Sequence, residues 1–221
     1  MAEAARREFL SHRHTRSEEI CGMAERIARV FRLAMEGFGR FRAESLRQAL
    51  EGGQAVEREA ERLTASLVAL AGGRPDGERA GVQSDIGAVS QLKLISGCIE
   101  DFCESAMAKI KEGVLFSDDA FKEIEDLHAE VESLLHNAVQ AMRGGEGNLS
   151  STVAEKGRAV EMMINNFSIE HEKRLISGAC EIRSSAIFLD ILDALRRIAG
   201  HAVRIVHILT RGPGSSYVKR N

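Results

Sequence analysis

Apolar residues recur at spacings of three and four positions along most of this chain, which is the period of one face of an α-helix. They form six long blocks, and breaks that contain glycine separate the blocks. The blocks predict helices at roughly residues 17–51, 54–71, 82–111, 117–142, 149–177 and 181–210. About three positions in seven are apolar in each block, a pattern typical of helices in bundles. The chain is therefore predicted to be all-α.

The breaks between the blocks define the predicted helix ends. Gly52-Gly53 is expected to end the first helix, and Gly144-Gly145 the fourth. The clearest predicted loop covers residues 72–81, where several glycines and Pro75 disfavour a helix. Ser117 has the side chain of a helix N-cap and is followed by two aspartates, which predicts the start of the fourth helix.

The six blocks fall into two groups of three with the same order, which predicts a tandem of two three-helix bundles. Each group is about 100 residues long, a size at which a bundle can bury a core. The predicted organisation is a frayed leader at 1–16, a first repeat at 17–112, a second repeat at 113–210 and a flexible tail at 211–221.

The composition of the chain favours some classes of function and cellular compartment over others. The net charge is -3, whereas proteins that bind nucleic acid by neutralising phosphates carry a basic face, so nucleic-acid binding is disfavoured. Arginines gather in the first forty-odd residues, either as a solvated helix surface or as a patch facing anionic lipid or an acidic partner. The four cysteines lack metal-site spacing, which favours a reduced cytosolic compartment. No apolar run is long enough to span a bilayer, although the chain could be a piece of a membrane protein.

Three local motifs, in this order and spacing, resemble the PhoU-like family over roughly residues 17 to 210. They are Ser17–Ile20, Ile169–Leu175 with Gly178, and Phe188–Leu192 leading into Leu195–Ile198. The likeness is greatest to the C-terminal cytoplasmic PhoU-like domain of sodium/phosphate cotransporter proteins. It implies a regulatory domain of phosphate transport, at the inner face of the membrane, that docks on a phosphate transporter membrane segment or a phosphate-signalling protein. A homodimer is a further expectation.

The resemblance also implies a metal site. Family members bind metal clusters through acid-x-x-x-acid pairs on the second and third helices of each repeat. The matching residues of the first repeat are Glu57, Glu61, Glu100 and Glu104. The cofactor implied by the resemblance is iron, zinc or another divalent cation. Carboxylates four residues apart share a helix face, so both members of a pair could bind the same ion. The competing interpretation is a solvated acidic face, because each glutamate directly follows a residue predicted to point inward.

The second repeat departs from this pattern. Its matching positions are Glu161, Asn165, Arg196 and Gly200, so three of the four acids are missing. Arg196 brings a fixed positive charge, which opposes cation binding at close range. We therefore expect no metal in the second repeat.

The sequence contains little that supports an enzymatic function. A di-iron bundle needs two Glu-x-x-His pairs, and only Glu125 with His128 fits that motif. Phosphate-binding loops and nucleophile elbows are absent. His171 falls on the apolar stripe of the fifth helix and is expected to be a hydrogen-bonded core or interface histidine. The chain is predicted not to be an enzyme; a metal-storage bundle or metalloenzyme, or a plain dimerising helical adaptor, is the alternative.

Overall fold

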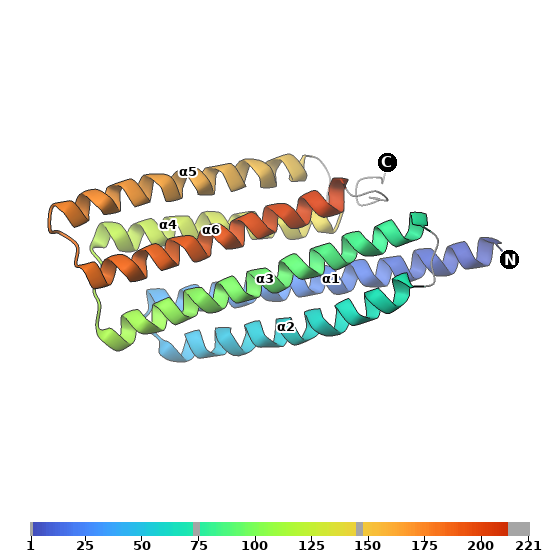
Figure 1. Cartoon of the computed structure of the whole chain (residues 1–221), viewed down its shortest axis with the longest axis horizontal. Helices are drawn as coiled ribbons and strands as arrows, with labels where there is room; N and C mark the ends of the chain where they lie inside the picture. Colours follow the sequence, from blue (N-terminus) through green and yellow to red (C-terminus); the bar gives the residue numbers. More distant parts are fainter. Residues whose placement is uncertain (1, 73–75, 145–147, 212–221) are drawn as a thin grey trace.

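The computed structural model describes residues 2–72, 76–144 and 148–211, and the side chains of residues 14–72, 78–144 and 148–210. This part of the chain consists of helices joined by short connections and contains no strand, which confirms the all-α prediction (Figure 1). The helices are α1 (Ala2–Gly39), α2 (Ala43–Ala71), α3 (Asp76–Glu112), α4 (Asp118–Met142), α5 (Leu149–Ile176) and α6 (Ile182–Arg211). The predicted flexible tail lies outside the described residues except for Arg211, which ends α6.

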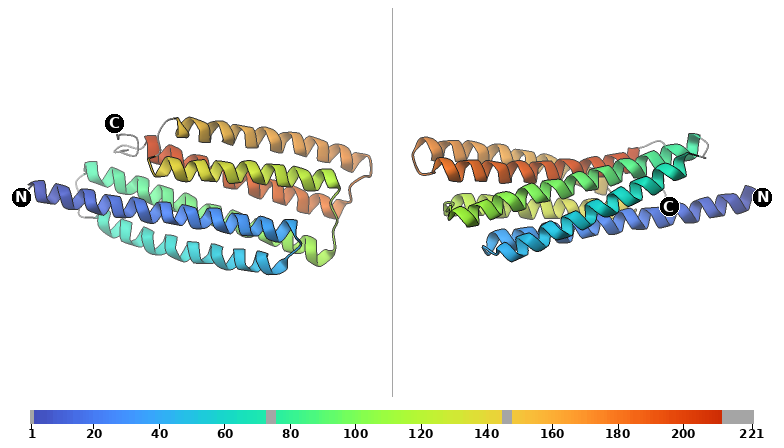
Figure 2. Two further views of the ribbon diagram at one scale, coloured as in Figure 1. Left: turned by 180° about the vertical axis from the view of Figure 1, so that it is seen from behind. Right: turned by 60° about the horizontal axis from the view of Figure 1, so that its bottom comes forward.

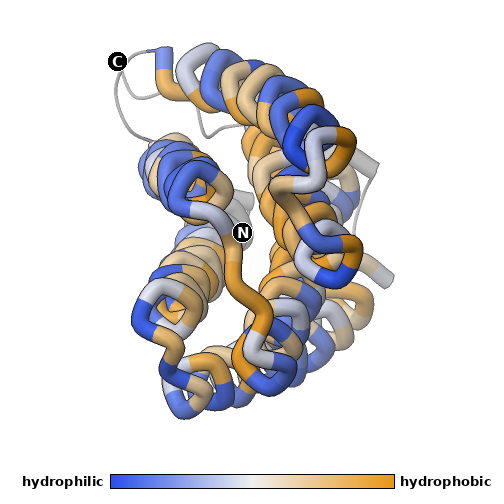
Figure 3. The backbone as a smooth tube through the Cα atoms, turned by 90° about the vertical axis from the view of Figure 1, so that its left-hand side faces the viewer, coloured by the Kyte–Doolittle hydropathy of each residue, from blue (hydrophilic) through white to orange (hydrophobic). Residues whose placement is uncertain are grey.

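The six helices form two layers. Helices α5, α6, α3 and α2 follow one another in the first layer, while α1 and α4 pack together behind it (Figures 1 and 3). Helices α1–α3 make one bundle and α4–α6 the other. The bundles meet where α3 packs against α6 and α1 against α4, and both pairs run antiparallel. Each helix at this junction thus meets its counterpart from the other repeat, as expected for a duplicated unit.

The core lies between the two layers, where the apolar stripes of the helices face inward. Its largest fully buried side chains include Phe31, Phe38, Phe102 and Phe188. The Phe38 ring lies 5.8 Å from that of Phe102 and 5.3 Å from that of Phe121, so one aromatic cluster joins α1, α3 and α4. Such burial is the dominant favourable term in folding.

The boundary between the first two helices differs from the prediction. Gly52-Gly53 does not break the chain but lies inside α2, whereas α1 ends at Gly39 and a short turn leads into α2. The glycines instead allow helices to approach. A Cβ atom on Gly37 would lie 2.7 Å from Leu46 Cγ, and one on Gly52 would lie 2.8 Å from Val30. Gly53 also leaves its carbonyl open to Ser96, whose hydroxyl donates to it at 2.9 Å.

The predicted frayed leader is likewise replaced by helix. Residues 2–16 continue α1, and Figure 2 shows this end of α1 reaching beyond the other helices. Arg16 gives one physical reason, because its Nε donates to Asp85 Oδ2 on α3 at 3.0 Å and both side chains are buried. This pair fixes Arg16, the last residue of the predicted leader, against α3.

The remaining boundaries agree closely with the sequence pattern, except for the start of α3. Ser117 caps α4 as predicted, since its hydroxyl accepts from the backbone N–H of Ala120 at 3.2 Å. The loop after α2 is shorter than expected because α3 already begins at Asp76; residues 73–75 lie outside the description. Gly178 follows α5 with a φ of 73°, a left-handed conformation that glycine adopts without strain. Within the described residues, no helix is both long and apolar enough to cross a membrane.

Candidate functional site

A groove runs over the face formed by α2, α3 and α6, with a volume of about 800 Å³. Its floor is made of small and apolar residues, among them Ala60, Val89, Gly97 and Cys98. Leu94 stands on the wall with 48% of its surface exposed. Charged side chains from all three helices surround this floor, so the groove offers apolar contact inside and charge at its rim.

Three of the four carboxylates predicted to bind metal lie on this groove. Glu57 and Glu61 come from α2, and Glu100 from α3, whereas Glu104 lies outside the lining one turn further along α3. Burial raises the pKa of Glu100, and the negative charges of Glu57, Glu104 and Asp101 raise it further. The predicted registers of α2 and α3 therefore do bring the acids close enough to repel one another.

Lys93 forms an ion pair with one of these acids, Glu61. Its Nζ donates to Glu61 Oε1 at 2.7 Å, and this hydrogen bond lowers the pKa of Glu61 and raises that of Lys93. In the described part of the chain, no three His, Cys, Asp or Glu side chains come together in a way that could hold a metal ion. The side chains of the quartet are not gathered around one point in this arrangement, and metal binding there stays a prediction.

The equivalent place in the second repeat contains an ion pair. Arg196 Nε on α6 lies 3.5 Å from Glu161 Oε2 on α5, in the positions that match Glu100 and Glu57. Arg196 of the second repeat thus has a guanidinium at the position where the first repeat has the carboxylate of Glu100. Asn165 and Gly200, at the other two matching positions, carry no charge.

The junction of the repeats supplies charged residues that sequence reasoning missed. Arg197 on α6 donates through Nη2 to Asp101 Oδ2 on α3 at 2.8 Å, and its Nε lies 2.9 Å from Asp193 Oδ2. On the same side, His201 Nδ1 lies 2.9 Å from Gln91 Oε1. The spacing of four between Asp193 and Arg197 was the only local signal, because contacts between α3 and α6 depend on the packing of the repeats.

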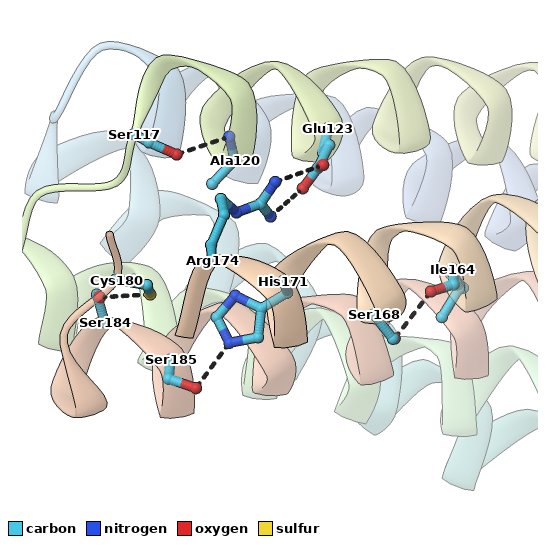
Figure 4. Close-up of polar contacts among 10 residues, drawn as sticks. All are labelled: Ser117, Ala120, Glu123, Ile164, Ser168, His171, Arg174, Cys180, Ser184 and Ser185. Carbon is cyan, nitrogen blue, oxygen red and sulfur yellow. Dashed lines mark hydrogen bonds and ion pairs between the residues drawn. The ribbon is translucent and has the colours of Figure 1, made fainter. Parts of the chain in front are cut away.

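A second polar cluster lies at the end of α5 and is structural (Figure 4). His171 is 3% exposed, its Nε2 lies 2.7 Å from Ser185 Oγ, and its ring stacks on Phe188, which confirms the prediction of a hydrogen-bonded core histidine. Burial and the neighbouring Arg174 lower the pKa of His171. Arg174 donates both terminal nitrogens to Glu123, at 2.8 and 2.6 Å. These contacts fasten α5 to α4 and α6.

Known proteins share parts of this sequence pattern and most of this fold. Residues 124–209 match the family model of the PhoU domain. The fold is similar to that of the phosphate transport system regulatory protein PhoU from Streptococcus pneumoniae, with a TM-score of 0.81 and 14% identity over 91% of this chain and 95% of that one. PhoU from Pseudomonas aeruginosa superposes with a TM-score of 0.68 and 17% identity, over 95% and 97% of the two chains. No curated protein sequence matches the chain. Residues 124–209 thus match the PhoU domain model, and the fold of the chain is similar to those of the two PhoU structures over most of its length.

Proposed function

We propose that this protein is a non-enzymatic regulator of phosphate transport that acts by docking onto a phosphate transporter or a phosphate-signalling protein. The observation that carries this proposal is the fold shared with a phosphate transport system regulatory protein over 91% of the chain. The PhoU domain match over residues 124–209 supports it independently from the sequence. The proposed place of action is the cytoplasmic face of the membrane, where such partners would be reached.

The proposal is tested by deleting the gene and measuring phosphate uptake and its response to external phosphate. We expect the deletion to change uptake or to abolish its adjustment to phosphate supply, and the intact chain to restore both. Normal uptake with a normal response in the deletion strain would overturn the proposal.

A finer proposal, that the chain is the cytoplasmic domain of a sodium/phosphate cotransporter, rests on the sequence motifs alone. It requires transmembrane helices in the same polypeptide or in a tightly associated one. The reading frame upstream of Met1 tests it directly. A run of apolar helices encoded there would support the proposal, and an upstream frame without them, with no membrane subunit copurifying, would contradict it.

Metal binding by the acidic quartet is the second candidate property. The specific observation in its favour is that Glu57 and Glu100 line the same groove: burial raises the pKa of Glu100, and the charge of Glu57 raises it further, a repulsion that a divalent cation would relieve. We predict that protein purified without chelator retains metal and that changing Glu57, Glu61, Glu100 and Glu104 to Ala removes it, as measured by elemental analysis. Glu155→Ala/Glu172→Ala, at exposed acids of α5, is the matched control. Wild-type protein without metal would exclude the storage and metalloenzyme alternatives.

A further inference from the structure

We propose that the groove on α2, α3 and α6 is a docking site for a basic amphipathic helix of the protein's partner. This inference rests on the proposed function, because it names the surface and the partner chemistry through which docking would occur. Amphipathic helices commonly bind proteins by laying an apolar face into a groove of this kind.

The shape of the groove suits a helix of two to three turns. Its α3 wall runs from Val89 to Asp101, which spans about 18 Å at the rise of about 1.5 Å per residue. Small residues keep the floor low: Ala60 and Ala65 line it from α2, and a Cβ atom on Gly97 would meet nothing within 4 Å. The exposed Leu94 offers an apolar contact to whatever enters.

The charge at the rim selects a basic occupant. Lys93 and Arg197, the basic groups that line the groove, are already engaged by Glu61 and by Asp101 with Asp193. Glu57 and Glu100 also line the groove, and among the described residues neither has a basic side chain within ion-pair distance. A lysine or arginine from a partner would pair with these carboxylates, whereas an acidic segment would be repelled by them.

The second repeat shows how such a basic group would sit. There the guanidinium of Arg196 lies beside Glu161 at the positions that correspond to Glu100 and Glu57. The duplicated scaffold therefore accommodates an arginine between its second and third helices. In the second repeat this arginine comes from α6 of the same chain. In the first repeat the basic side chain beside Glu57 and Glu100 would come from the partner helix.

Crosslinking in cells of the source organism tests the proposal. A photo-crosslinking amino acid at position 94 reports on the groove, and mass spectrometry identifies the captured segment. We expect a helical segment with apolar residues on one face and Lys or Arg beside it. The capture should fall at least tenfold in E57K/E100K and recover when the basic residues of the segment are changed to Glu. E155K/E172K, on exposed acids of α5, is the matched control and should capture as wild type does.

Capture of a second copy of this chain, of lipid or of an acidic segment would overturn the proposal. So would equal capture by E57K/E100K and the control. Circular dichroism of each variant confirms that it folds. Complementation separates the two proposals: if deletion disturbs phosphate uptake and E57K/E100K restores it fully, the groove inference fails while the regulatory function stands. If deletion has no effect on uptake, the regulatory function itself fails.

Discussion

Single side chains set the charge around the acids of each repeat. Lys93 pairs with Glu61 in the first repeat and Arg196 with Glu161 in the second, so a basic residue of this chain lies among the acids in both. The resemblance to the PhoU-like family pointed to the acids and to Arg196, and helical spacing places the two acids of each pair on one helix face. The sequence did not predict the pairing of Lys93, since an exposed lysine can reach several partners and only the packing of α2 on α3 selects Glu61.

Loss of one partner of the Arg174–Glu123 pair should destabilise the protein strongly, because the two side chains are only 15% and 13% exposed. We expect R174M to destabilise the protein by about 3 kcal/mol, since it leaves the Glu123 charge buried without its partner. In E123L/R174M the loss should be smaller than the sum of the single losses. Urea denaturation followed by circular dichroism measures all three. Additive losses would show that the pair is not coupled.

His128 should make stability depend on pH. It is 6% exposed and stacks on Phe31, and burial lowers its pKa to about 4 even though the charge of Glu132 raises it. As pH falls from 6.5, the unfolded chain binds this proton first, so stability is full above about pH 6.5 and decreases toward pH 4. At about 1.4 kcal/mol per pKa unit, the decrease is about 3 kcal/mol.

Thermal unfolding at several pH values compares wild type with H128F, which keeps an aromatic ring against Phe31. We expect the variant to lose less stability between pH 7 and pH 4, because the carboxylates titrate equally in both proteins. Identical pH profiles would show that His128 does not carry this dependence.

At the level of elements, the existence of the helices followed from the apolar period, whereas the ends of the first three helices did not all follow from it. Gly52-Gly53 has the composition of a break, yet it lies inside α2 because the glycines let α2 approach Val30 and Ser96. The actual turn contains Phe41 with a φ of 54°, which the local sequence does not indicate. A glycine pair in the sequence is compatible with a turn or with a close contact between helices. Only the packing of the neighbouring helix determines which of the two it forms.

The contact at Gly37 can be tested directly. A Cβ atom there would lie 2.7 Å from Leu46 Cγ and 2.9 Å from its backbone nitrogen, so the start of α2 would have to move. We expect G37A to destabilise the protein by about 2 kcal/mol. Gly81 is the control, because a Cβ atom there meets nothing within 4 Å and G81A should gain up to about 1 kcal/mol from helix propensity. Thermal melts that fail to separate the two variants would contradict this account.

For the whole molecule, the duplicated order of helices predicted the two bundles but not how they join. Nothing local specifies that α3 packs on α6 and α1 on α4, or that Arg197 reaches Asp101. These contacts lie far apart in sequence, and they become visible only when both repeats are placed. The groove shares this origin, since two of its walls belong to one repeat and the third to the other.

Separated from the first repeat, residues 113–211 would expose the faces of α4 and α6 that otherwise meet α1 and α3. Because these partners are counterparts of α4 and α6 themselves, we expect the isolated segment to dimerise through the same antiparallel pairs. Analytical ultracentrifugation at several concentrations measures this association. A stable helical monomer at micromolar concentration would contradict the expectation.

The short connection at residues 113–117 is the covalent link between the two repeats. Since all other contacts across the junction are noncovalent, they form equally well between two chains that have exchanged their second repeats. If the backbone of this connection straightened, the two repeats of one chain would separate. The α6 of that chain could then pack on the α3 of another, which would produce an intertwined dimer with an unchanged core. The length and stiffness of five residues therefore govern whether the protein refolds at high concentration as separate molecules or as exchanged pairs.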